Sequence, residues 1–508
     1  MKWLPAVLPA LVILAFVPGW HDVAVAKWLV VYLAGLMCVL WLLVHAREWD
    51  VKDALVVSVV AWFALSLSWS ADWMQGALHL IRAGSIAAVF LYCRRLDDRR
   101  SLSYGAGAAV VLSLLMTFVV SGSLGGTWNE NVEAEFLSIS IPLVHWSIAA
   151  LAAARLIFSD SHMQWAGLIA VILTIAFVTG ARYVVRAPIV AAVAFIAVCV
   201  ASILLVESAD ARESVLPRLQ LALGTLSMWW DSPLIGQGLG SFDYLWPTFQ
   251  NADTEAFPGL WFLGMNEPWI LPGAAHNEPL QVLAETGLIG FGLLVLAVCI
   301  GLKPTPRNFI ALVLLGSFAL LDFPLQNPET AVLGTLALAQ ASPLSAKRFS
   351  LPSLLQIPAF GAAVAMTFVV WMGVSHARAE SAYSKTYALN LVHMASGVND
   401  RSRSFAELAF SAEALNAFPY PTEYRLQLYR SMVNAFLSGT LIDERAENSM
   451  WRIAQSASPE NPGLLVSRVY FWRASGQCES KCEPELKRIA ANNWRLTAMD
   501  DITRMVLE

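Results

Sequence analysis

The chain has 508 residues, of which 57% are hydrophobic and 14% are charged, and its formal net charge is −5. Soluble proteins are about 45–50% apolar and about 25% charged, so this composition excludes a soluble enzyme and a disordered chain. A slightly acidic chain also lacks the basic surface of a nucleic-acid-binding protein. What remains is a polytopic membrane protein, because apolar runs of about 18 residues or more recur along the chain.

About twelve apolar runs follow one another, near residues 3–19, 27–45, 53–70, 77–93, 102–123, 134–158, 164–180, 187–206, 281–302, 308–325, 329–343 and 355–375. Each is expected to be helical, because backbone polar groups in lipid must be satisfied within their own segment. The first run, preceded by Lys2, is typical of a signal anchor or of a cleavable signal peptide, and we favour the anchor.

The predicted fold is therefore all-α. It is a polytopic transmembrane helix bundle of about 12 spans with a long extracytoplasmic loop and a C-terminal soluble helical domain. The expected parts are an N-terminal bundle (1–206), the loop (207–280), further transmembrane helices (281–375) and the soluble domain (376–508).

Lysines and arginines in short loops predict the orientation, because these residues are enriched in the loops on the cytoplasmic side of a membrane protein. The marks are Arg94–Arg100, the pair Lys303 and Arg307, and the pair Lys347 and Arg348. Counting from the last two pairs puts 207–280 and the C-terminal tail outside the cytoplasm. Counting forward from the first mark puts 180–186 outside as well. One span at 187–206 cannot satisfy both counts, so either 183–206 is a re-entrant hairpin or a span is miscounted.

The tail differs from the rest in composition. From Val374 onward it holds 15 of the 33 Lys/Arg and 15 of the 38 Asp/Glu, which is typical of a soluble domain. Helix-period apolar positions predict helices at Ser404–Asn416, Thr422–Ser438, Glu444–Gln455 and Pro462–Arg473, and the pattern resembles tetratricopeptide helix pairs without a clean 34-residue repeat. Cys478 and Cys482 are either a local disulfide in an oxidising compartment or a reduced pair on a helix.

The loop 207–280 is long for a plain connection and contains the polar chemistry. Gly236, Gly238 and Gly240 resemble part of a phosphate-binding loop, but no strand precedes them and no GxGxxG is completed. A nucleotide site is therefore not expected. We expect these glycines to let the backbone turn tightly against a neighbour or a ligand.

His276 stands just before an apolar run, beside Asn277 and Glu278. A neutral histidine there can take a proton from an attacking hydroxyl, and a solvated interfacial histidine is the plain alternative. Nearby arginines offer a fork of donors that matches phosphate oxygens. They are Arg182, Arg186 and Arg218. Tryptophans are dense in the loop, and Trp230 is a candidate for stacking on a sugar.

Several segments resemble the O-antigen ligase and polymerase superfamily. "AHNEPLQVLAETGLIG" is similar to its His-Asn hallmark before a transmembrane helix, and "DSPLIGQGLGSF" is similar to the Pro-Leu-x-Gly-x-Gly segment before it. "TGAR", ending at Arg182, resembles its Thr-Gly-Ser-Arg. "GTWNENVEAEFLSISIPL" resembles its Asn-x-Asn start of a span, and "LDFPLQNPETAVLGTLALA" resembles its late span pair. The matches lie between about 120 and 345, in the family's order.

The resemblance implies a multi-pass glycosyltransferase of the bacterial inner membrane, with its loop and C-terminal domain in the periplasm. It would transfer a glycan from an undecaprenyl-diphosphate-linked donor to a hydroxyl of lipid A-core, a glycan or a protein, with no cofactor and no required metal. Carried over by position, His276 is the base or positions the acceptor, Arg218 and Arg182 hold the diphosphate, and Arg186 is a secondary candidate. The residues implied to orient the sugar or His276 are Asn131, Asn277 and Glu278.

Two departures from the family are visible. The family has two spans between its Thr-Gly-Ser-Arg and the long loop, whereas about 23 apolar residues are available here, which affects Arg182. The helical tail is absent from simple ligases. The alternatives are a polymerase that extends the lipid-linked glycan and, in a different class, a polysaccharide transporter, for which no clear inverted repeat is present. A C-terminal tail that recruits partner proteins is compatible with each of these functions.

Overall fold

The computed structural model describes residues 2–17, 20, 22–46, 48–96, 100–119, 130–157, 209–249, 273–345, 347–350, 359–396, 401–456 and 462–491. The described helices of residues 1–350 are α1 (Leu4–Leu14), α2 (Ala24–His45), α3 (Val51–Ser66), α4 (Trp73–Cys93), α5 (Arg100–Val119), α6 (Glu130–Ser140), α7 (Trp146–Ile157), α10 (Ala209–Asp231), α11 (Phe242–Phe249), α12 (Glu278–Cys299), α13 (Pro306–Ala319) and α14 (Pro328–Gln340). The 3-10 turns are η1 (Leu67–Trp69) and η3 (Ile141–Leu143). The strands β1 (Glu48–Trp49) and β2 (Phe349–Ser350) form one short antiparallel pair.

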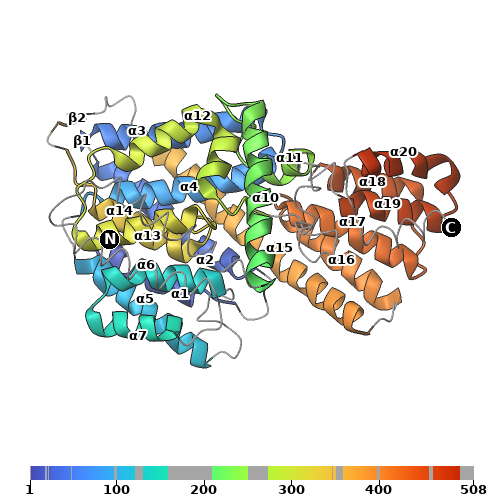
Figure 1. The fold of residues 1–508 in the computed structure, drawn as a ribbon, viewed down its shortest axis with the longest axis horizontal. Helices are drawn as coiled ribbons and strands as arrows, with labels where there is room; N and C mark the ends of the chain where they lie inside the picture. The colour runs from blue at the N-terminus through green and yellow to red at the C-terminus, as the bar shows by residue number, and fades with distance from the viewer. Residues whose placement is uncertain are drawn as a thin grey trace.

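Most of these helices run side by side in a bundle, and α10 crosses the end of the bundle almost at right angles (Figure 1). Within the described residues, four helices are long and apolar enough to cross a membrane, namely Ala24–His45, Val51–Trp69, Trp73–Cys93 and Glu278–Cys299. Small residues let the backbones approach closely. A Cβ added at Gly35 of α2 would lie 2.7 Å from Ser85 Cα of α4.

Helix starts follow local chemistry. Proline lies in the first turn of α12, α13 and α14, where its missing N–H costs nothing. Asp50 caps α3 and forms a reciprocal capping box with Asp53, and Asp72 caps α4 by accepting a bond from the backbone of Gln75. The starts of these elements are therefore determined by short sequence signals.

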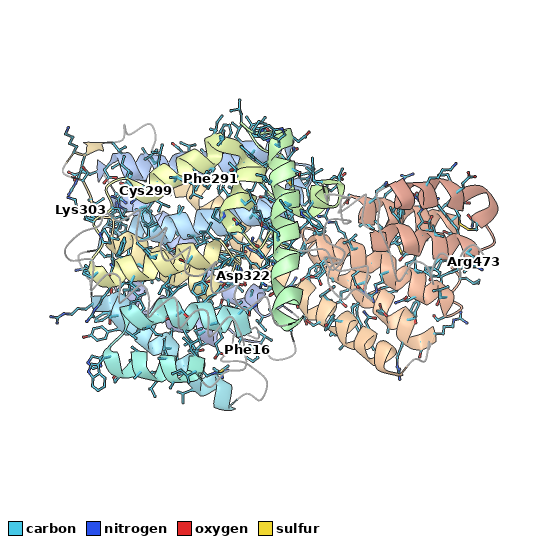
Figure 2. All side chains as sticks on the ribbon, viewed as in Figure 1. Phe16, Phe291, Cys299, Lys303, Asp322 and Arg473 are labelled. Carbon is cyan, nitrogen blue, oxygen red and sulfur yellow. A yellow bond between two sulfur atoms is a disulfide. The ribbon has the colours of Figure 1, made fainter. Side chains whose placement is uncertain are left out.

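One end of the bundle gathers the basic loops expected in the cytoplasm. Arg94 donates to both oxygens of Asp50 and to Asp53, and also to the Ser342 carbonyl, so the segments before α3, after α4 and after α14 meet there. Arg348 pairs with Glu48 across the strand pair at 2.7 Å. Cys299 and Lys303 also lie at this end, whereas Asp322 lies at the opposite end (Figure 2).

The remaining helices extend from that opposite end. They are α15 (Ala359–Ser396), α16 (Arg401–Ala417), α17 (Thr422–Leu437), α18 (Glu444–Gln455), α19 (Pro462–Ala474) and α20 (Cys478–Ala491). The long helix α15 packs against α2 and then continues to α16, so it passes from the bundle into the tail (Figure 1). The expected boundary at residue 376 falls inside this helix, and the four helices predicted in the tail are present as α16 to α19.

The structure tests two further expectations from the sequence. The apolar run 134–158 is two helices, α6 and α7, because Pro142 cannot continue the helical hydrogen bonds and a 3-10 turn replaces them. Cys478 and Cys482 are joined as a disulfide within α20. The runs 164–180 and 187–206, and with them the conflict between the two span counts, lie outside the described residues.

Candidate active site

His276 and Asp322 form the centre of the candidate site. His276 Nδ1 lies 2.8 Å from Asp322 Oδ1, and the Asp322 side chain is 4% exposed. A carboxylate that accepts the Nδ1 proton leaves Nε2 as the free basic nitrogen of a neutral imidazole. His276 also has a positive φ of 49°, a strained conformation of the kind that gathers at functional sites. The imidazole is therefore held in position and partly accessible, with 29% of its side chain exposed.

Arg218 of α10 approaches the same carboxylate from another side. Its Nε donates to the Leu321 carbonyl at 3.2 Å, and one terminal nitrogen lies 4.0 Å from Asp322 Oδ2. The guanidinium is 22% exposed, so it is within reach of solvent or a ligand. The structure thus brings together His276 and Arg218, which were predicted from the sequence. Asp322, which was not predicted, lies between them.

Asn277 and Glu278 hold the start of α12 against the segments on either side of Asp322. Asn277 caps α12 by accepting a bond from the backbone of Leu280, and its amide nitrogen donates to the Leu320 carbonyl at 3.1 Å. Glu278 accepts bonds from the backbone N–H groups of Leu325 and Gln326, at 2.8 and 2.9 Å. The observed contacts of both residues connect His276 to the segment that carries Asp322.

Glu135 of α6 is a second residue that the sequence reasoning passed over. It is fully buried, and neither of its carboxylate oxygens has a hydrogen-bond partner among the described residues. Asp322, Glu278 and Arg218 lie within electrostatic range of it. A buried carboxyl without partners requires an explanation, and proximity to a reacting group is one. A lone acid inside an apolar run is the signal that points to Glu135 and to Asp322.

The segment Gly236–Gly240, called the glycine-rich turn below, packs against a break in helix α12. At Gly287 the helix leaves α geometry (φ 68°, ψ −176°), and the free N–H groups of Leu288 and Ile289 donate to the carbonyls of Pro233 and Leu234. In return, the backbone of Gly238 donates to the Glu285 carbonyl at 2.8 Å. These backbone groups, set free by the break, are thus paired, as a membrane interior requires. The turn therefore contacts a neighbouring helix.

Two acids support this turn. The Glu285 carboxylate accepts bonds from the backbone N–H groups of Gly240 and Phe242, at 3.0 and 3.3 Å. Asp243 follows in α11. Burial raises the pKa of the Asp243 carboxyl well above its usual range, and the neighbouring carboxylates of Glu285 and Asp72 act in the same direction.

The other predicted site residues are separate or undescribed. Asn131 lies half-buried in the first turn of α6, in the helix that also carries Glu135. Trp230 is 75% exposed near the end of α10, and its ring meets that of Trp229 edge-on at 5.8 Å. Arg182 and Arg186 lie outside the described residues.

A comparison with known families gives one match. Residues 147–295 match the family model of O-antigen ligase, and this stretch includes Arg218, the glycine-rich turn and His276. Over this stretch the chain is similar to O-antigen ligases. Asp322 and Glu135 lie outside the matched residues. A search of curated proteins and a search of solved structures each gave no match to the chain.

The glycine-rich turn allows a matched substitution test. A Cβ added at Gly240 (φ 78°) would lie 2.2 Å from the Gly76 nitrogen, whereas one at Gly301 (φ 65°) meets nothing within 4 Å. Gly301→Ala is expected to cost only the left-handed backbone strain, about 1–2 kcal/mol. Gly240→Ala adds a steric clash of about 1–3 kcal/mol. Unfolding of both variants in detergent measures the difference. Equal stability of the two would show that the turn does not pack closely against α4.

Proposed function

We propose that this protein is a membrane glycosyltransferase that moves a glycan from an undecaprenyl-diphosphate-linked donor to an acceptor hydroxyl. The observation that carries the proposal is the His276–Asp322 pair beside Arg218, in a chain that is similar to O-antigen ligases over residues 147–295. The acceptor is a hydroxyl of lipid A-core, a glycan or a protein. The reaction uses no cofactor or metal.

The geometry supports the following chemistry. His276 Nε2 accepts the proton of the acceptor hydroxyl as the oxygen forms a bond to the anomeric carbon. The bond from that carbon to the diphosphate oxygen breaks, and the electron pair leaves on the polyprenyl diphosphate. Arg218 stabilises the charge that builds on this leaving group, with Arg182 as a second donor and Arg186 as a secondary one. Attack from the face opposite the diphosphate inverts the anomeric configuration.

The other candidate residues have supporting roles. Asn277 and Glu278 keep His276 in register with Asp322, and Asn131 and Trp230 contact the glycan. In this arrangement the protonated imidazole, formed in the reaction, stays next to the Asp322 carboxylate. That pairing favours the transition state over the ground state.

We also propose the location. The chain crosses the bacterial inner membrane about twelve times. The bundle end with Arg94 and Arg348 faces the cytoplasm, because basic loops stay on that side. The opposite end, with Asp322 and the C-terminal domain of tetratricopeptide-like helices, faces the periplasm. The disulfide of α20 supports this orientation, because such bonds persist in oxidising compartments.

The disulfide gives a direct test of orientation. In intact spheroplasts, a membrane-impermeant maleimide is expected to label Cys478 and Cys482 only after treatment with an impermeant reductant. A variant with both residues replaced by serine is the control for labelling of other cysteines. Labelling only after lysis would place the tail in the cytoplasm and contradict the proposed orientation. Labelling in intact spheroplasts without reductant would keep the tail outside but contradict the disulfide.

Product analysis tests the function itself. Purified chain in liposomes receives an undecaprenyl-diphosphate-linked oligosaccharide together with lipid A-core, free oligosaccharide or protein as acceptor. A glycan moved to a new acceptor indicates ligation, whereas a longer lipid-linked ladder indicates the alternative, a polymerase. Stable donor with every acceptor, combined with movement of the intact donor across the bilayer, would support the transporter instead.

A further inference from the structure

A cavity of about 280 Å³ lies between α3, α4, α12 and α14, outside the His276–Asp322 pair. Apolar side chains from all four helices form most of its wall, among them Phe63, Ile86, Leu294 and Leu338. Its size is close to the lower limit of about 300 Å³ for small-molecule sites. The volume is sufficient for a stretch of one hydrocarbon chain.

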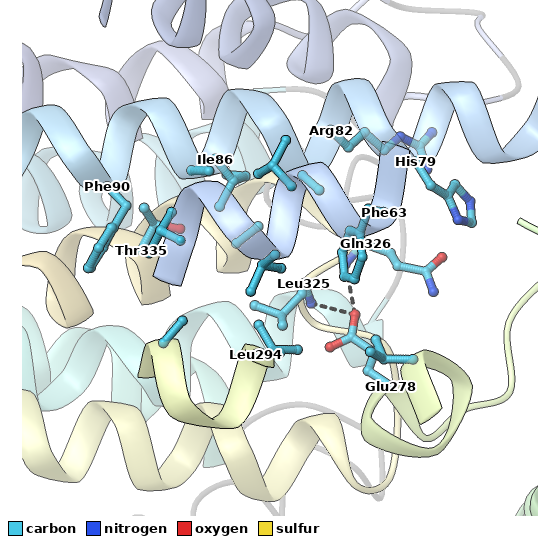
Figure 3. A pocket seen from close by; sticks show the side chains of 18 of the residues that line it. Phe63, His79, Arg82, Ile86, Phe90, Glu278, Leu294, Leu325, Gln326 and Thr335 are labelled. Carbon is cyan, nitrogen blue, oxygen red and sulfur yellow. Dashed lines mark hydrogen bonds between the residues drawn. The ribbon is translucent and has the colours of Figure 1, made fainter. Parts of the chain in front are cut away.

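The charged and most of the polar lining residues are gathered at one end of this cavity. Figure 3 shows Arg82, His79, Gln326 and Glu278 grouped there, whereas Phe90 and Thr335 lie at the other end. Glu278 follows His276 by two residues and is bonded to the turn after Asp322. The polar end of the cavity is therefore at the same end of the bundle as the candidate active site.

Arg82 is the cation of this polar end. Its guanidinium lies 5.2 Å from the centre of the Trp28 ring, and its Nε is buried without a hydrogen-bond partner among the described residues. The described carboxylates include no ion-pair partner for it, although Glu278 lines the same cavity and its Oε2 is likewise unpartnered. A cation inside a transmembrane bundle is costly unless an anion compensates it. An anionic group of a ligand would supply the missing partner.

We propose that this cavity binds a single hydrocarbon chain that ends in a phosphate group, with the chain between α3, α4, α12 and α14 and the phosphate at Arg82. That the chain is the isoprenoid of the donor or of its product rests on the proposed function. Arg82 is then a binding residue for the lipid carrier, distinct from Arg218 beside Asp322. His79, one turn before Arg82 on α4, lies beside the phosphate.

Four substitutions on α4 separate chain binding from phosphate binding. Ala83 lines the cavity, so Ala83→Leu fills it, whereas the neighbouring Gly84 has open space around an added Cβ and Gly84→Leu is the matched control. Arg82→Gln removes the charge at similar size, and Arg82→Lys keeps it. Thermal unfolding of each full-length variant shows whether it is folded before binding is measured.

Native mass spectrometry with undecaprenyl phosphate, undecaprenol and phosphatidylglycerol as probes gives the readout. Removing one charge-assisted contact is expected to weaken undecaprenyl phosphate binding by about tenfold to a hundredfold in Arg82→Gln, with rescue in Arg82→Lys. Undecaprenol binding should not respond to Arg82→Gln. Ala83→Leu should weaken the binding of both isoprenoid probes by about tenfold, and Gly84→Leu should weaken the binding of neither.

Two results would overturn the inference. Unchanged undecaprenyl phosphate binding in both folded Arg82→Gln and Ala83→Leu would show that the cavity is not the site. Equal competition by phosphatidylglycerol would assign the cavity to bilayer phospholipid. The His276→Ala variant separates this inference from the proposed function, because it should bind undecaprenyl phosphate normally while transfer is lost. Full transfer by His276→Ala, with binding still lost in Ala83→Leu, would reject the catalytic proposal alone.

Discussion

Replacing His276 by alanine is expected to lower the rate of glycan transfer by about 10²–10⁴-fold, the usual contribution of a positioned general base. The imidazole is held by the 2.8 Å contact with Asp322, and alanine removes the basic nitrogen from that position. The loss should appear in kcat, because the base acts in the transition state and contributes little to binding of the donor. The measurement is the initial rate of transfer in liposomes from an undecaprenyl-diphosphate-linked oligosaccharide.

Two companion variants make this result specific. His145→Ala removes an exposed histidine that contacts Ser147 and Trp146, and it should transfer at the normal rate. Asp322→Asn keeps the shape of the partner but no longer fixes the Nδ1–H tautomer, so it should also lose activity and change the pH profile. Normal transfer by folded His276→Ala would reject the catalytic role, and normal transfer by Asp322→Asn alone would reject the pairing.

Replacing Arg425 by methionine is expected to destabilise the docking of the tail by about 3–5 kcal/mol, because it leaves a buried carboxylate without its cation. Arg425 of α17 pairs with Asp72, the cap of α4, and both side chains are at most 3% exposed. Thr422 also donates to Asp72 at 3.2 Å. Hydrogen exchange of α16 and α17 in the full-length variant should rise, since these helices would open more often from the bundle.

Controls distinguish this buried pair from charge removal in general. Lys481→Met breaks the exposed pair with Glu444 and should cost less than about 1 kcal/mol. The double variant of Arg425→Met with Asp72→Asn should recover part of the lost stability, because no unpaired charge remains. If Arg425→Met exchanged no faster than Lys481→Met, the pair would not hold the tail in place.

The docked tail also bears on the active site. Asp72 caps α4, and Gly76 in its first turn touches the Leu239 carbonyl of the glycine-rich turn, which Glu285 holds from α12. If the tail undocked, Asp72 would cap α4 less firmly, and α4 is the first element in this series of contacts. We therefore expect Arg425→Met to reduce transfer as well, by less than His276→Ala, because no reacting group is removed.

The sequence by itself determined the features that depend on local signals. Apolar runs predicted membrane helices, and the helices of the tail followed from their periodicity. The glycine-rich turn was expected to turn tightly against a neighbour or a ligand. It does so at the break in α12, where the φ of Gly287 is positive and its neighbours need new hydrogen-bond partners. His276 and Arg218 were singled out because charged and titratable groups are rare in the membrane part.

Only the tertiary structure decided which of these groups meet. Asp322 lies 46 residues from His276, and Asp72 lies 353 residues from Arg425, so neither pair leaves a spacing pattern in the sequence. The division of the run 134–158 into α6 and α7 depended on how Pro142 was accommodated. The cavity below Arg82 is formed by helices from two distant parts of the chain, α3 and α4 on one side and α12 and α14 on the other. Such features arise from packing between distant segments, whereas local periodicity and capping report only on each segment's own backbone.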